Sequence, residues 1–533
     1  MGENGENRTV ISNDLWGRLD IYASSDAITR ENVVSELNTA LPYHVQNLLQ
    51  EDFLYWYRRN VQPILYRHKE VRPEILNIVQ ENHADEIVTF KNGYFLTQPA
   101  FYTARTTEAQ SKVDKLNEFL YRSYKHSADD KIVNWFHTVG KGVLYVEPDR
   151  DNDPETPIHA YALDPRSAFV VYSLRPGNEP VMGVNMVVIG DRAKFDVYTK
   201  DYVFHLNGGA TGKLMTAQVN SDFLATAIDV ESVERNTLGL IPIIEYRYNS
   251  VNMGAFESVI PLLDAINNVM SNRIDGVEQF IQSLAVATNC EFPEGTTAND
   301  IRKAGMIVLK SIGENRSDFK ILSEQLNQSE TQVLVDYLYD AVLRICAMPS
   351  STKGGRSTSD TGTAVLARDG WFQADAAARN CADLFKESNK QFDRIFVEIL
   401  RRRGLLDINL SDFELNIVRN ETVNIQSKSQ AFNTLMASGL DPELAAMKSG
   451  ISNDPVSDVK KSKKWLTMRW GDPDAPQEVM ASPDAAGGGS PAGGAQPQAK
   501  QSKPPQSAGD NKEPSKAKTQ DGKVWIEGYW QDR

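Results

Sequence analysis

The sequence predicts an α+β protein that is mainly helical, with its strands gathered in one stretch instead of alternating with helices. Residues 142–249 form a series of short β-branched and aromatic runs separated by Pro, Gly, Asp and Asn turns, which is typical of strands. Residues 256–285 and 363–404 instead repeat apolar residues every three or four positions, which indicates two long amphipathic helices.

The composition limits the class of protein. A chain of 533 residues with 41% apolar content can bury a large core and suggests two to four domains. The net charge of −14 argues against a protein whose whole surface binds nucleic acid, although a local basic element could still contact nucleic acid. Cys290, Cys346 and Cys381 are scattered and read as free thiols. We expect no signal peptide and no membrane span, because no apolar run approaches ~20 residues.

The helix predicted at 256–285 carries two distinct faces. Its apolar stripe runs from Phe256 to Leu284, and a second, largely acidic stripe follows the same steps. The residues of the second stripe are Asp264, Asn268, Ser271, Asp275 and Glu278. Such a helix either lines a solvent-filled space while its sides pack on neighbouring elements, or is a solvated surface helix of an ordinary domain.

A loop rich in Gly and Ser separates two further helices. A helix at 328–348 opens with the capping-box pair Ser329 and Gln332, and Pro349 ends it. The loop at 349–362 contains Lys353, Gly354, Gly355 and Arg356. The long helix that follows closes on three arginines and Gly404, which suit the negative end of a helix dipole and a glycine cap.

The remaining elements are predicted from the same signals. Residues 1–85 should be mainly helical, with RPEILNIVQ (72–80) starting a helix at its proline, and 87–104 should be extended around an Asn92–Gly93 turn. Further helices are expected at 108–126, 129–138, 424–437, 442–448 and 454–465, a small α/β insert at 286–327 and a strand at 413–418. Beyond 470 the composition predicts a disordered tail, whose last dozen residues are either a docking peptide or a sticky disordered end.

No segment carries a convincing catalytic or ligand-binding motif. NGGATGKL (207–214) is one residue short of a phosphate-binding loop and has Leu214 where Ser or Thr is needed, so a hairpin turn is favoured. DRDNDPE (149–155) has acidic spacing similar to a calcium loop, but Pro154 and Ala160 occupy its glycine and glutamate positions, which favours an exposed turn. The seven histidines lack metal-ligand spacing. We therefore expect no catalytic, cofactor-binding or metal-binding residues and no enzyme activity.

Four segments, in their order, resemble the portal, or head–tail connector, proteins of tailed double-stranded DNA phages, of the siphophage type. The resemblance covers roughly residues 41–464. The segments are NGYFLTQPAFYTA (92–104), TVGKGVLYVEPD with YALDPRSAFVVY (138–172), NTLGLIPIIEYRYN with FESVIPLLDAINNVMSN (236–272) and DTGTAVLAR (360–368). Each is weak alone, and their order and spacing together are fairly specific.

The resemblance implies a portal fold assembled as a ring of about twelve identical subunits around a channel. It implies a wing at 1–255, stem helices at 256–285 and 328–348, a clip at 286–327 and a tunnel loop at 349–362. A long helix at 363–404 would lead from wing to crown. The crown would take 405–470 and give one strand to the wing, and 471–533 would be the tail.

The implied function is the DNA channel at one capsid vertex of the virion, assembled in the host cytoplasm. Implied partners are double-stranded DNA, the large terminase subunit, a head–tail adaptor, and the major capsid and scaffolding proteins, with no membrane. Asp264, Asp275 and Glu278 would then face the channel and repel the duplex, while Lys353 and Arg356, on a loop made flexible by Gly354 and Gly355, would touch its phosphates. The alternatives are a terminase-like DNA-processing ATPase and a capsid shell or scaffold protein.

Overall fold

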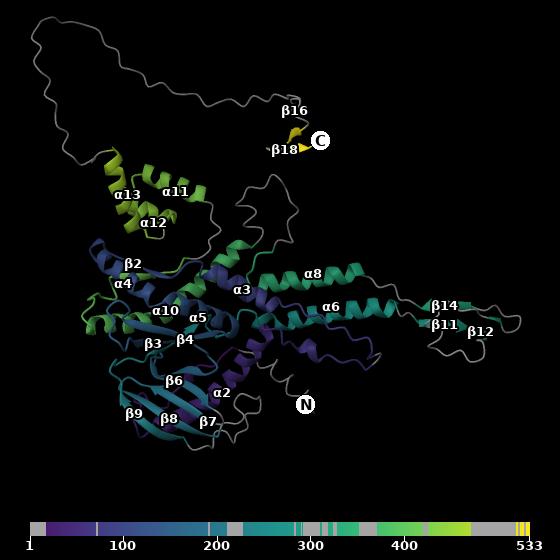
Figure 1. Ribbon diagram of the computed structural model, residues 1–533, viewed down its shortest axis with the longest axis horizontal. Helices are drawn as coiled ribbons and strands as arrows, with labels where there is room; N and C mark the ends of the chain where they lie inside the picture. Colours follow the sequence, from purple (N-terminus) through teal and green to yellow (C-terminus); the bar gives the residue numbers. More distant parts are fainter. Residues whose placement is uncertain are drawn as a thin grey trace, which may run out of the picture. The chain divides into compact units, whose positions relative to one another are not determined.

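The computed structural model divides into two units, residues 1–470 and 471–533 (Figure 1). It describes residues 17–70, 73–189, 192–210, 228–281, 284–288, 290–291, 310–311, 318–322, 328–350, 370–418, 425–452, 454–470, 519–520, 523–526 and 529–532. The α+β class predicted from the sequence is confirmed, with strands concentrated between residues 141 and 247. No described helix is both long and apolar enough to cross a membrane.

A six-stranded sheet covered by a long helix forms the first layer. The strand order is β1-β5-β6-β7-β8-β9, antiparallel except where β1 runs parallel to β5. The strands are β1 (Ile21–Tyr22), β5 (Ala168–Tyr172), β6 (Pro180–Ile189), β7 (Arg192–Tyr198), β8 (Tyr202–Ala210) and β9 (Asp229–Arg235). Helix α2 (Val33–Arg58) buries Val33, Leu37 and Leu41 against this sheet, in one core with Phe169, Phe195 and Phe204.

The second layer packs helices around a smaller sheet, β10-β3-β4. Its strands are β3 (Lys141–Pro148), β4 (Ile158–Leu163) and β10 (Ile243–Arg247), and its helices are α3 (His83–Phe95), α4 (Gln110–Arg122), α5 (Lys125–Val139) and α10 (Trp371–Arg402). Phe385, Phe392 and Phe396 of α10 join this core. Gly140 turns α5 into β3 with φ of +92°, and a Cβ there would lie 1.9 Å from the carbonyl oxygen of Asn252, so only glycine fits.

The predicted single strand near residue 413 is confirmed and joins distant parts of the chain. β15 (Phe413–Asn416) pairs antiparallel with β2 (Phe101–Ala104), some three hundred positions earlier. Beyond it lie three helices, α11 (Ile425–Ala437), α12 (Pro442–Ser449) and α13 (Pro455–Trp470), which match the three predicted from the sequence.

A helix pair follows the strand-rich region. The short helix η4 (Glu257–Val259) leads into α6 (Ile260–Ile281), and α8 (Gln328–Ile345) runs beside α6 (Figure 1). In the sequence, four short strands come between these two helices. β11 (Leu284–Thr288) pairs with β14 (Asp318–Leu322), and β12 (Cys290–Glu291) pairs with β13 (Lys310–Ser311). Most of the α/β insert predicted at 286–327 lies outside the described residues.

Two neighbouring segments were predicted with the wrong secondary structure: the first was expected to be helical and is extended, and the second was expected to be extended and is helical. Residues 73–82 form no helix despite Pro73, because their backbone N–H groups bond to side chains of α6. Residues 83–95 form helix α3 instead of an extended turn, since Asn82 caps the helix by accepting from Asp85 N–H and Gly93 lies within it. In the first segment tertiary contacts outweighed the helix-start signal of the proline, and in the second a capping residue outweighed the local β propensity.

The tail prediction is also corrected in part. β16 (Thr519–Gln520), β17 (Lys523–Ile526) and β18 (Tyr529–Asp532) form an antiparallel sheet in the second unit. Trp525 pairs with Trp530 across β17 and β18. The aromatic residues favour strands, so the end of the chain contains a small sheet within the tail whose composition predicted disorder. Residues 471–518 are outside the described part.

Candidate functional site

The helix pair is anchored at one end and exposed at the other. Phe256, Val259, Leu263 and Ile266 pack with Val342 and Leu343 of α8, and with the end of α2 and the start of α3. Further along, Ile274 and Val277 of α6 are 43% and 41% exposed, and Val333 and Tyr337 of α8 are 69% and 64% exposed. Apolar side chains are thus exposed on both helices at this end of the pair, a feature that is typical of interaction surfaces.

An extended segment, residues 75–81, lies along α6 and is here called the strap. Three polar side chains spaced four residues apart on α6 each accept one strap N–H. The pairs are Glu81 N–H to Asn267 Oδ1 (2.8 Å), Val79 N–H to Ser271 Oγ (2.9 Å) and Asn77 N–H to Asp275 Oδ1 (2.7 Å). Four helical residues rise about 6 Å and two extended residues about 6.6 Å, so the two repeats stay in register over three contacts.

Asp275 is the main electrostatic contact between the strap region and α6. Its carboxylate is 3% exposed and lies 2.8 Å from the Arg67 guanidinium and 2.6 Å from the Lys69 ammonium. Burial alone would raise the pKa of Asp275, but the bonds from Lys69 and Asn77 and the charge of Arg67 together lower it. Asp275 is therefore an ionised group held between two cations of its own chain.

Asp275 was expected to face a channel, and this geometry corrects that expectation, because the residue is buried against its own chain. Glu278 is half-buried and accepts from the Asn77 side chain at 2.7 Å, and half-buried Asp264 accepts from the Tyr57 hydroxyl at 2.8 Å. The predicted polar stripe contains Ser271, Asp275 and Glu278, which contact the strap, but it omitted Asn267 and included the exposed Asn268. Its partner was missed, because the strap lies almost two hundred positions earlier and was expected to be helical.

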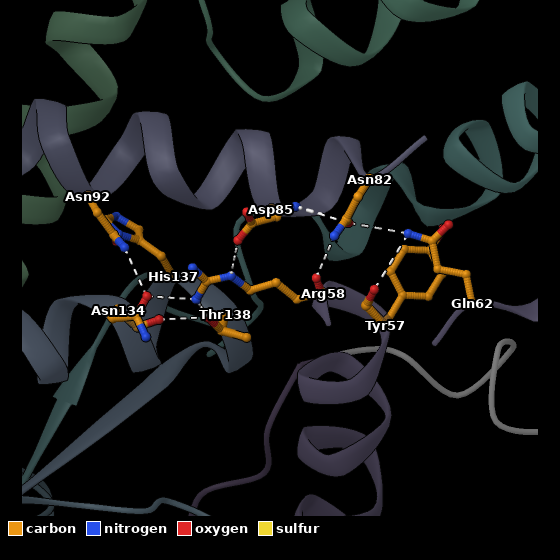
Figure 2. A network of polar contacts seen from close by, with 9 residues as sticks. All are labelled: Tyr57, Arg58, Gln62, Asn82, Asp85, Asn92, Asn134, His137 and Thr138. Carbon is orange, nitrogen blue, oxygen red and sulfur yellow. Dashed lines mark hydrogen bonds and ion pairs between the residues drawn. The ribbon is translucent and has the colours of Figure 1, made fainter. Parts of the chain in front are cut away.

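A polar network around Arg58 joins the end of α2 to helices α3 and α5 (Figure 2). Arg58, at the end of α2, donates to Asp85 of α3 (2.9 Å) and to Asn134 and Thr138 of α5 (2.6 and 2.8 Å). Asn82 donates to the Arg58 carbonyl at 2.8 Å. One guanidinium thus fixes the relative positions of three helices.

The same network continues at both ends. Asn92 of α3 donates to Asn134, and His137 Nδ1 lies 2.7 Å from the Asn92 carboxamide oxygen. Burial, with the charges of Lys91 and Arg58, holds the pKa of His137 well below its usual value, so the ring is neutral and Nδ1–H is the donor. At the other end Asn267 of α6 donates to Gln62 at 2.6 Å, which connects the network to the strap.

The DNA-contact site predicted on the loop at 349–362 falls almost wholly outside the described residues. Lys353, Gly354, Gly355 and Arg356 lie outside the described residues, whereas Pro349 and Ser350 before them are described. Asp149–Glu155 forms a turn between β3 and β4, with Asp149 bonded to His159. Among the described residues no group of three or more His, Cys, Asp or Glu side chains is placed to hold a metal ion.

The fold joins a strand-rich body to a helix pair that exposes apolar side chains at one end. The phage portal protein family described as SPP1 Gp6-like matches residues 46–469. The chain belongs to this family, and its role is that of a portal protein in the phage virion.

Two further comparisons add little. No curated protein matches the chain. Among solved structures, a chain from the virion of a native gene transfer agent particle is similar with a TM-score of 0.37 and 9% identity, over 69% of this chain and 89% of that one. A likeness this distant does not bear on the function.

Proposed function

We propose that the protein forms a closed ring, of about twelve copies, that surrounds the DNA channel at one capsid vertex. The match to the portal family over residues 46–469 carries this proposal. The exposed apolar residues on α6 and α8 support it, because neighbouring copies in a ring would cover them. No catalytic step is proposed; the protein acts as a structural channel.

The parts of the ring are assigned from the element order. Residues 1–255 form the wing, α6 and α8 the stem, 286–327 the clip, 349–362 the tunnel loop and 405–470 the crown. The clip docks the large terminase subunit and later the head–tail adaptor, while the outer body meets the capsid and scaffolding proteins during assembly in the host cytoplasm. The bonds from the Tyr57 hydroxyl to Asp264 and from the Asn267 amide to Gln62 support a stem held on the wing.

The tunnel loop makes weak contacts with passing DNA. Lys353 and Arg356 supply the positive charges, and Gly354 and Gly355 supply backbone freedom. Lys353→Ala with Arg356→Ala should leave the ring intact and lower the yield of packaged DNA. Normal packaging in this variant would reduce the loop to a connector.

Negative-stain microscopy of the purified chain, with light scattering, tests the ring. The expected result is a particle with a central hole and the mass of about twelve subunits. A monomer at every concentration, or a closed shell, contradicts the proposal. ATP hydrolysis by the pure protein would favour the terminase-like alternative.

A further inference from the structure

Helix α13 carries a dense basic run that the tunnel loop and stem do not account for. Lys460, Lys461, Lys463 and Lys464 fall within five positions, and Arg469 follows. Residues 425–470 contain seven basic and four acidic side chains, although the whole chain has a net charge of −14. Helix α13 itself has five basic side chains and one acidic side chain, so it carries a net positive charge in an acidic protein.

The first two lysines of the run, Lys460 and Lys461, have no structural explanation among the residues that the structure describes. Lys460 and Lys461 are exposed and form no ion pair with any described residue. Like charges three and four residues apart destabilise a helix. The helix dipole does not account for the run either, since its effect is confined to the last turn, and Lys460 lies ten residues before Trp470.

The nearby acidic residues serve the start of the helix instead. Asp454 accepts from Ser457 N–H at 3.2 Å, and the Asp458 carboxylate accepts from the Ser452 hydroxyl at 2.7 Å. Both carboxylates lie at the N-terminal end, where the helix dipole favours negative charge. Lys460 and Lys461, further along, have no such role among the described residues, and both are available to an external anion.

We propose that the exposed basic face of α13 binds the phosphate backbone of double-stranded DNA. Lys460 and Lys461 share the outer side of the helix with Trp465 and Met468, which are 53% and 78% exposed. Clustered lysines on a helix make phosphate contacts without reading base sequence. The choice of duplex DNA among polyanions rests on the proposed channel function, and the contact is separate from the tunnel loop.

The test compares two triple variants of the full chain by fluorescence anisotropy with a duplex of mixed sequence. Lys460→Gln, Lys461→Gln and Lys464→Gln should weaken binding about tenfold at moderate salt and lower the slope of log affinity against log salt by about 2 to 3. A matched control replaces Lys115, Lys200 and Lys390, exposed lysines on other elements, with glutamine. The control should bind as the native protein does.

Each outcome decides the assignment. Equal affinity and salt slope in both variants would overturn it. Loss of binding to vesicles containing phosphatidylserine, with unchanged DNA binding, would overturn it in favour of a membrane-surface role for this basic amphipathic helix. Microscopy of the same samples reports the ring separately, so a ring without α13-dependent DNA binding refutes this inference alone, and a missing ring refutes the proposed function.

Discussion

Helices α6 and α13 both carry polar residues at helical spacing, and these residues have opposite surroundings. On α6, Asn267, Ser271 and Asp275 are at most 2% exposed and each accepts a backbone N–H of the strap. On α13, Lys460 and Lys461 are exposed and meet no acidic partner among the described residues. A polar stripe in a sequence thus marks where a partner is needed, and only the structure tells whether the chain itself supplies it.

The largest expected effect is the loss of stability on replacing Asp275 of α6, and no comparable loss is expected on α13. Asp275→Ala leaves Arg67 and Lys69 without their carboxylate and Asn77 N–H without its acceptor. We expect the strap to open more easily by about 2 to 4 kcal/mol, since breaking a buried ion pair leaves uncompensated charge. Hydrogen exchange of a peptide spanning residues 75–81 measures this opening.

Glu278→Ala provides the matched control for that experiment. Glu278 is half-buried and accepts from the Asn77 side chain, so its loss leaves the three backbone bonds of the strap in place and should cost about 1 kcal/mol or less. Equal exchange in both variants would mean that Asp275 does not hold the strap, and the contrast between α6 and α13 would fail.

Acid should weaken the same contact. The pKa of Asp275 is lowered in the folded protein, so its ionised form contributes stability above the ordinary carboxylate pKa, and this is lost as pH falls through the folded value. The melting temperature of Asp275→Asn should therefore lie below that of the native protein from about pH 6 to 8 and approach it below about pH 4. A constant difference across this range would contradict the assigned ionisation.

The sequence was sufficient for the elements whose signals are local. The strands between residues 141 and 247, helices α6 and α8 and the three helices after residue 425 all follow from periodicity, caps and turns. The strap could not be found in this way, because Ile75 to Glu81 take their conformation from side chains near residue 270. The β-branched residues of that segment and the capping Asn82 were the only local signals for an extended segment followed by a helix start.

The middle contact of the strap should have an intermediate effect. Ser271→Ala removes the hydroxyl that accepts Val79 N–H and donates to Val79 C=O, leaving a backbone group unpaired. The expected cost is about 1 to 2 kcal/mol, measured by the same exchange experiment. Asn268→Ala, an exposed neighbour on α6, should change it by less than about 0.5 kcal/mol.

The smallest expected effect on folding belongs to α13 and completes the contrast. Lys460→Gln with Lys461→Gln removes like-charge pairs from an exposed face, so stability should be unchanged or rise by about 0.5 kcal/mol. Chemical denaturation of the native and variant chains, followed by circular dichroism, checks this. If the variant were instead destabilised by more than about 1 kcal/mol, the lysines would have partners within the fold. Their exposure would then no longer indicate an external anion. As on α6, the partners of the polar residues on α13 would come from the chain itself.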